Sequence, residues 1–147
     1  MNKKLLYVFL IIMIFIFLSC EASTTIWDIE LVQPPDKLEY IVNLDNHLDF
    51  TGGKIRLVTG YKTIFGISET NSGSSEALDN YLEQNNIEIR YISSFNNISD
   101  DEKNNFRYNV VTDVNFSKIG EYTVRIYHYP DKYAEYNIKV IESEEEF

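Results

Sequence analysis

The sequence predicts an all-β domain, a sandwich or a barrel, from its hydrophobic alternation, its turn residues and the absence of a strand–helix repeat. Apolar side chains recur at every second residue in short segments, as at Trp27, Ile29 and Leu31, and this period is that of a strand with one buried face. Gly and Pro residues separate the segments. No glycine-rich phosphate motif occurs, and a length of 147 residues suits one domain.

The first strands are expected on either side of proline and glycine turns. Pro34-Pro35-Asp36 should end the strand that begins at Trp27, and a turn at Gly52-Gly53 should follow the next apolar pair. Another turn is expected near Gly60, because glycine supplies the positive φ that many turns need. The alternating segments cover residues 27–31, 38–42, 55–57, 64–67, 87–91, 106–110, 122–126 and 136–140.

Two polar stretches interrupt this pattern, Ser68–Asn86 and Ser93–Asn105. In the first, Ser75 is expected to cap a short helix over residues 76–84, with an apolar stripe at Leu78, Tyr81 and Leu82. In the second, the pair Ser99 and Glu102 fits a capping box, which predicts a turn of helix.

The last strands are expected around two turns. Gly120 precedes the strand that contains Tyr122, and Pro130-Asp131 forms a type I turn. His128 is placed beside this turn and is expected to be solvated. Residues 142–147 are acidic and are interpreted as a solvated tail.

The N-terminus has the organisation of an export signal. Lys3 and Lys4 precede an uninterrupted apolar run over residues 5–18, and the single cysteine, Cys20, follows Ser19. The run is shorter than the roughly 20 residues that span a bilayer. The end of the run, Leu18-Ser19-Cys20, resembles the bacterial lipoprotein lipobox, which implies that residues 1–19 are a signal peptide and that Cys20 is lipidated. An uncleaved anchor and an ordinary signal peptide are the alternatives. The stretch 20–26 would then be a lipidated tether.

The net charge excludes some classes of binding partner, and the cysteine content indicates how the fold is held together. The formal net charge is −10, so nucleic acid is a poor partner and the domain should stand off an anionic membrane. With Cys20 lipidated, no disulfide is possible, and packing alone must hold the fold. Glu21 is not the Asp that retains many lipoproteins at the inner membrane, which favours the outer membrane of a bacterial cell envelope.

Three segments resemble bacterial immunoglobulin-like domains. Trp27–Tyr40 is similar to their first strand and kink, and Leu48-Asp49-Phe50-Thr51-Gly52-Gly53 is the most specific match. Phe116–Val124 resembles their corner with a Gly-x-Tyr motif. The resemblance implies an immunoglobulin-like β-sandwich of about seven strands over residues 27–141, with one short helical insertion. Structural roles are implied for Trp27, Gly52, Gly53, Gly120 and Tyr122.

Candidate binding residues come from aromatic side chains. Tyr81 and Phe95 lie in the polar stretches, and Tyr127 and Tyr129 belong to a tyrosine cluster that includes Tyr133 and Tyr136. Such side chains form interfaces or stack on sugars, but they also suit half-buried strands. Tyr81 has a second interpretation, in which it covers the core together with Leu78 and Leu82.

No enzyme chemistry is predicted. No nucleophile with a recognisable elbow occurs, and neither a cofactor nor a metal is expected, because Asp45, His47 and Asp49 lack a further convergent ligand. The function expected is a lipid-anchored envelope protein with a non-catalytic binding or spacer domain, whose partner is an envelope protein or a glycan. The first alternative is an outward-facing carbohydrate-binding or adhesion module. The second is a small hydrolase or an enzyme-inhibitor domain.

Overall fold

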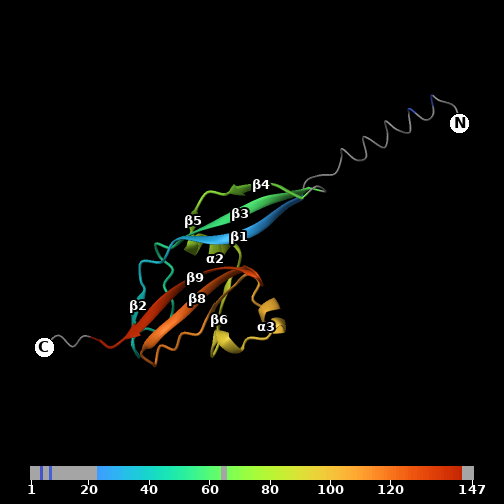
Figure 1. Ribbon diagram of the computed structural model, residues 1–147. Helices are drawn as coiled ribbons and strands as arrows, with labels where there is room; N and C mark the ends of the chain where they lie inside the picture. Colours follow the sequence, from blue (N-terminus) through green and yellow to red (C-terminus); the bar gives the residue numbers. More distant parts are fainter. Residues whose placement is uncertain (1–3, 5–6, 8–22, 64–65, 144–147) are drawn as a thin grey trace.

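Two β-sheets pack together in the computed structural model of the chain, which describes Lys4, Tyr7 and residues 23–63 and 66–143 (Figure 1). The expected all-β sandwich is therefore confirmed. Cys20, the signal segment before it and residues 144–147 lie outside the described residues. The start of β1 and the end of β9 lie at opposite ends of the molecule (Figure 1).

The first sheet has the order β1-β3-β4, with β5 also paired to β3. It comprises β1 (Ser23–Gln33), β3 (Lys54–Thr63), β4 (Gly66–Ser72) and β5 (Glu76–Ala77). All its pairs are antiparallel, and Ile29 lies opposite Leu57. Pro34 follows β1 directly, as expected, because proline has no N–H to donate to a ladder.

The second sheet has the order β2-β9-β8-β7-β6. It comprises β2 (Glu39–Ile41), β6 (Glu88–Tyr91), β7 (Asn109–Thr112), β8 (Gly120–Tyr129) and β9 (Lys132–Ile141). The strands β8 and β9 form a hairpin across the predicted Pro130-Asp131 turn. The two edge strands, β2 and β6, run parallel to their neighbours.

The core lies between the sheets, and strand alternation supplies it. In β9, buried Ala134, Tyr136, Ile138 and Val140 alternate with exposed residues. These side chains cluster with Ile29 and Ile55 of the first sheet. Full burial of one large apolar side chain contributes about 1.5–3 kcal/mol, so this shared cluster joins the two sheets.

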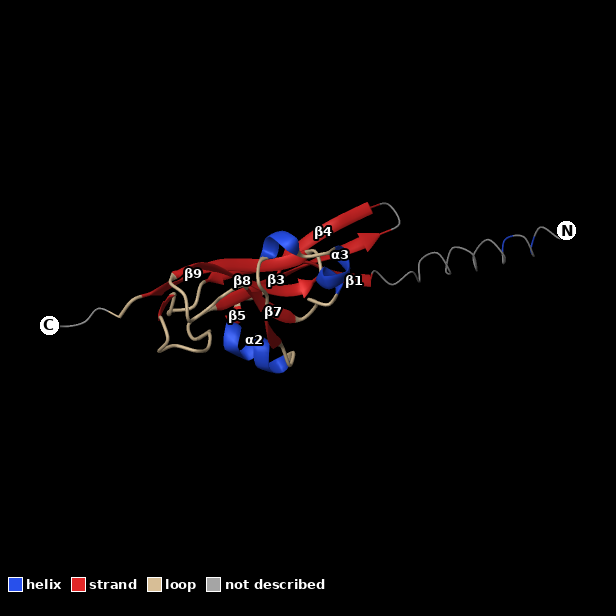
Figure 2. Cartoon of the chain, turned by 90° about the horizontal axis from the view of Figure 1, so that it is seen from below, coloured by secondary structure: helices blue, strands red, loops and turns tan. Residues whose placement is uncertain are grey.

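A short helix, α2 (Leu78–Gln84), lies between β5 and β6 in the chain, and Figure 2 shows it at one side of the sheets. Leu78 and Tyr81 are both buried in the main core cluster. The predicted start was wrong: Ser75 does not cap the helix, because Glu76 and Ala77 pair with β3 and the helix begins at Leu78.

The second polar stretch folds as predicted. It contains a 3-10 helix, η1 (Phe95–Asn97), and α3 (Asp100–Asn104). Ser99 Oγ accepts from the Glu102 N–H, and the Glu102 carboxylate accepts from the Ser99 N–H at 2.9 Å. The capping box is thus confirmed.

Three expectations about local structure were wrong. No turn forms near Gly60, because β3 continues through it to Thr63. Residues 68–72, expected to be irregular, belong to β4. The strand expected over 106–110 begins only at Asn109, because Tyr108 has a φ of 56° and lies in a turn.

The predicted structural glycines have distinct surroundings. Gly52 has a φ of +80° in the turn before β3, where L-residues are strained. Gly53 is buried, and a Cβ there would meet the side chain of Leu78 at 3.0 Å. Gly120 starts β8 in ordinary backbone, with only van der Waals neighbours. The sequence correctly predicted a turn at the first two.

Tyr122→Phe is expected to lower the free energy of unfolding by about 1 kcal/mol, the usual scale for one hydrogen bond. The Tyr122 hydroxyl donates to the Lys118 carbonyl oxygen at 2.7 Å, the local backbone bond expected for a corner tyrosine. Tyr136→Phe is the matched control, because the buried Tyr136 hydroxyl has no hydrogen-bond partner among the described residues. Urea denaturation should show a lower midpoint for the first variant only. Equal midpoints for wild type and Tyr122→Phe would contradict the role of this bond.

Candidate functional site

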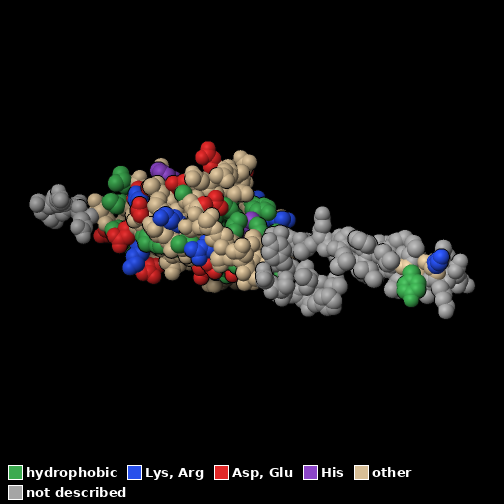
Figure 3. Space-filling model, turned by 90° about the horizontal axis from the view of Figure 1, so that it is seen from above, with side chains coloured by type: hydrophobic (Ala, Val, Ile, Leu, Met, Phe, Trp, Pro, Cys, Tyr) green, Lys and Arg blue, Asp and Glu red, His purple; other side chains and the backbone are tan. Residues whose placement is uncertain are grey.

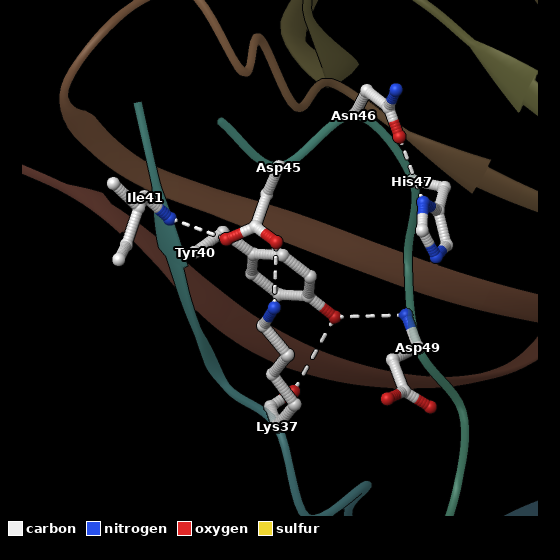
Figure 4. A network of polar contacts seen from close by, with 7 residues as sticks. All are labelled: Lys37, Tyr40, Ile41, Asp45, Asn46, His47 and Asp49. Carbon is white, nitrogen blue, oxygen red and sulfur yellow. Dashed lines mark hydrogen bonds and ion pairs between the residues drawn. The ribbon is translucent and has the colours of Figure 1, made fainter. Parts of the chain in front are cut away.

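The loop after β2 is held by a polar network around Tyr40 (Figure 4). The Asp45 carboxylate accepts from Lys37 Nζ at 2.7 Å and from the Ile41 N–H at 2.6 Å. The Tyr40 hydroxyl accepts from the Asp49 N–H at 3.0 Å. The hydrogen bond from Lys37, and then that from Ile41, holds the pKa of Asp45 below its usual range. This network closes the loop onto the core.

The candidate metal ligands of this loop do not converge. Asp45 is bonded to Lys37, and the His47 ring contacts the Asn46 side chain. Asp49 accepts from the Thr51 N–H in a local turn. Within the described part of the chain, no three His, Cys, Asp or Glu side chains are placed to share a metal ion.

His128 is buried rather than solvated, contrary to expectation. It is 4% exposed in β8, and its Nδ1 lies 2.8 Å from the Tyr81 hydroxyl of α2. The Tyr108 and Tyr129 rings also pack against it, with centroids 5.0 and 4.9 Å away. Burial, and then the Arg107 guanidinium, lowers the pKa of His128 below its usual range. This group joins α2 to the second sheet.

Acid is therefore expected to destabilise the fold through His128. In the folded protein the pKa is lowered, so below about 6.5 the unfolded chain binds a proton that the folded chain does not. The contribution of neutral His128 to the free energy of unfolding is fully present above this pH. It is lost as the pH falls toward the pKa that His128 has in the folded protein. The free energy of unfolding, measured between pH 8 and pH 5, should depend less on pH in His128→Gln than in the wild type. His47→Gln is the control, because His47 is exposed. Parallel profiles for His128→Gln and the wild type would refute this assignment.

A cleft of about 620 Å³ lies on the outer face of the second sheet, between the β8–β9 hairpin and the η1–α3 segment. We call it the hairpin cleft. Figure 1 shows α3 beside the hairpin end of the sheet. The residues that line the hairpin cleft are Phe95, Asp100, Lys103, Asn104, Arg125, Tyr127, Pro130, Asp131 and Tyr133.

Arg125 organises the aromatic side of the hairpin cleft. Its guanidinium carbon lies 4.2 Å from the Phe95 ring centroid and 4.6 Å from that of Tyr133. The same group donates from Nε to Glu135 at 3.0 Å. The centroids of the Tyr127 and Tyr133 rings lie 4.9 Å apart. The cation is thus held between two aromatic rings, each contact being favourable by about 0.5–2 kcal/mol.

The cleft floor is a second small hydrophobic cluster. Tyr127 is 2% exposed and packs with Phe106 and Val111, while Phe95 and Ile98 cover the cluster in part. Burial raises the pKa of Tyr127, so its phenol stays protonated at neutral pH. The cluster fixes the η1–α3 segment to the sheet and gives the cleft a rigid base.

A second cleft, of about 630 Å³, has a different character. It lies at the end of β6, and most of its lining is polar, including Asn43, Asn46, Ser93 and Asp113. Tyr91 is its most exposed aromatic side chain, at 53%, and no ring stacking or cation contact within the described residues involves it. The hairpin cleft is therefore the stronger candidate site.

The four predicted binding residues do not form one surface. Phe95 and Tyr127 do meet in the hairpin cleft. Tyr129 lies on the Arg107 side, 4.8 Å from that guanidinium. Tyr81 is 1% exposed, so its prediction as a surface anchor was wrong and its alternative role in the core is correct. Tyr127 is a buried support of the cleft rather than an exposed anchor.

The most informative cleft residue, Arg125, was missed, and Tyr133 was noted only as a member of a tyrosine cluster. The hairpin register carried the signal: Tyr127 lies opposite Tyr133, and Arg125 opposite Glu135. Arg125 and Tyr127 are two residues apart in β8, so they share a face. Counting back from the Pro130-Asp131 turn would have placed these side chains together.

No family model, no curated protein and no solved structure matches the chain. Among the described residues, no helix has the length and the apolar composition needed to cross a membrane.

Proposed function

We propose that this protein is a lipid-anchored component of a bacterial cell envelope whose immunoglobulin-like sandwich binds a partner without catalysing a reaction. The observation that carries the proposal is the hairpin cleft, where Arg125 holds the Phe95 and Tyr133 rings in place. Tyrosine and arginine are enriched among residues that dominate binding energy. A surface assembled in advance also loses little side-chain entropy when it binds.

The surroundings of the cleft support a binding role. Figure 3 shows Lys and Arg side chains interspersed with Asp and Glu side chains on the face seen from above, and the charges at the cleft itself are balanced as well. Each cation at the cleft has a carboxylate partner. Recognition there depends on ring surface and directed hydrogen bonds rather than on net charge.

Anchoring is proposed at Cys20, with the outer membrane as the destination. A lipid anchor stabilises membrane attachment by about 0.8 kcal/mol per buried methylene, and two chains make it stable. Metabolic labelling with a fatty-acid analogue should mark the wild-type chain and leave Cys20→Ala unmarked. Equal labelling of the two proteins would refute the anchor while leaving the cleft untouched.

Binding is tested by sedimentation with delipidated envelope fragments, so that the anchor has no bilayer to enter. The full chain should sediment with the fragments, and Tyr133→Ala should reduce the bound fraction about tenfold. Tyr91→Ala is the matched control, because Tyr91 is a more exposed tyrosine outside the hairpin cleft. Equal retention of both variants would exclude the cleft as the binding surface.

A further inference from the structure

We propose that the hairpin cleft binds an uncharged oligosaccharide, with the Tyr133 ring as its stacking surface. The inference rests on the proposed binding function and assigns a ligand class to the same site. It follows from three features of the cleft: its ring geometry, its internal charge balance and the polar groups at its rim.

The neighbours of Tyr133 fix its ring, and the residue stays partly exposed. Tyr133 is 37% exposed, although Arg125 and Tyr127 both pack against it. The C–H groups on one face of a sugar ring are weakly positive, and the face of an aromatic ring is negative. A tyrosine ring that is held in place and still accessible therefore suits a sugar ring.

The charge balance argues against an anionic ligand. Arg125 is paired with Glu135 at 3.0 Å, and Lys103 is paired with Asp100 at 2.8 Å. The Arg125 guanidinium also lies between the Phe95 and Tyr133 rings. No cation that lines the cleft lacks a carboxylate partner, and the lining also includes Asp131. An anion would have to compete with these carboxylates, whereas an uncharged ligand would not.

The rim groups match sugar hydroxyls. Asn104 offers both an amide donor and a carbonyl acceptor, and Asp131 offers carboxylate acceptors. Both lie in the lining together with Tyr133. A hydroxyl donates and accepts at once, so a rim that mixes acceptors and donors can satisfy adjacent hydroxyls. The volume of about 620 Å³ lies within the range of ligand pockets.

The test is calorimetric titration of the purified full chain in a detergent without a sugar headgroup. The probes are four uncharged oligosaccharides, cellohexaose, maltohexaose, laminarihexaose and N-acetylated chitohexaose, with a sulfated heparin hexasaccharide as the charged comparison. The variants are Tyr133→Ala, Tyr133→Phe and the control Tyr91→Ala. At least one uncharged probe should bind the wild type more tightly than the sulfated probe does. Tyr133→Ala should weaken that binding about tenfold or more, while Tyr133→Phe and Tyr91→Ala should retain it.

Each other outcome overturns the inference. Tighter binding of the sulfated probe would assign the cleft to anions. An equal loss in Tyr91→Ala would move the site elsewhere. Failure of all four uncharged probes, combined with sedimentation that still depends on Tyr133, would show that the cleft binds another partner, such as a protein. In that last case the proposed binding function survives and only the ligand class is lost.

Discussion

Tyr81→Ala should lower the free energy of unfolding by about 3–5 kcal/mol, the range for removing a large aromatic side chain from a core. Tyr81 is 1% exposed and belongs to the main core cluster. Its hydroxyl also contacts His128 Nδ1 at 2.8 Å. The substitution leaves a cavity under α2 and removes the only hydrogen-bond partner of the buried His128 ring among the described residues. The cavity and the lost hydrogen bond both weaken the packing of α2 on the second sheet.

Chemical denaturation followed by circular dichroism measures this effect. Glu83→Ala is the matched control on the same helix, because Glu83 is exposed, and it should change stability by less than about 0.5 kcal/mol. Tyr81→Phe should be intermediate, since it keeps the ring and removes the hydroxyl. A loss below about 1 kcal/mol in Tyr81→Ala would show that the ring does not serve the core.

Gly60→Ala should be the second most damaging change, at about 1–3 kcal/mol, the usual cost of overpacking. Gly60 is buried within β3, and a Cβ there would overlap the Trp27 indole of β1. Trp27 is the extra residue at a register shift between β1 and β3. The indole therefore lies over the glycine rather than over a side chain, and an added Cβ would have to displace it.

Gly120→Ala is the control for this prediction. Gly120 is also a strand glycine, but its nearest neighbour to an added Cβ is the Tyr122 hydroxyl at 3.4 Å, an ordinary contact. Its stability should change by less than about 0.5 kcal/mol. Intrinsic fluorescence of the single tryptophan should shift in Gly60→Ala and not in Gly120→Ala. Similar midpoints and spectra for the two variants would mean that the indole does not pack on Gly60.

Most of the strands that the sequence predicted have one buried face, as in β1 and β9. Residues 27–31 and 136–140 alternate in hydrophobicity because the sandwich buries every second side chain. The capping box at Ser99 and Glu102 was equally visible, since it depends on residues three apart. These features are local, so a single sequence can carry them.

Other elements depend on distant partners and were not visible. Residues 68–72 of β4 are Ser-Glu-Thr-Asn-Ser, with no apolar alternation, and they form a strand because β3 supplies the ladder. Glycine is a typical turn residue, so Gly60 was expected in a turn. It lies within β3 instead, where the absence of a side chain leaves room for the Trp27 indole of β1. His128 has turn residues beside it, and it is buried because α2 covers it.

The candidate site was only half predictable for the same reason. The aromatic side chains Phe95 and Tyr127 were identified by type, but the sequence does not show that residues 93–105 fold onto the outer face of β8. Arg125 becomes informative only when this segment brings Phe95 within 4.2 Å of its guanidinium. The contact joins residues thirty positions apart, and no local pattern indicates it.

Photo-crosslinking in living cells tests the central claim. This claim is that the protein lies in the cell envelope and binds its partner through the hairpin cleft. The full chain would carry p-benzoylphenylalanine at one position, in the variants Tyr133→p-benzoylphenylalanine and Tyr91→p-benzoylphenylalanine. Irradiation should convert the first variant to a discrete adduct of lower mobility in envelope fractions, and the second variant should give none. Adducts at Tyr91 alone, or at neither position, would contradict the claim.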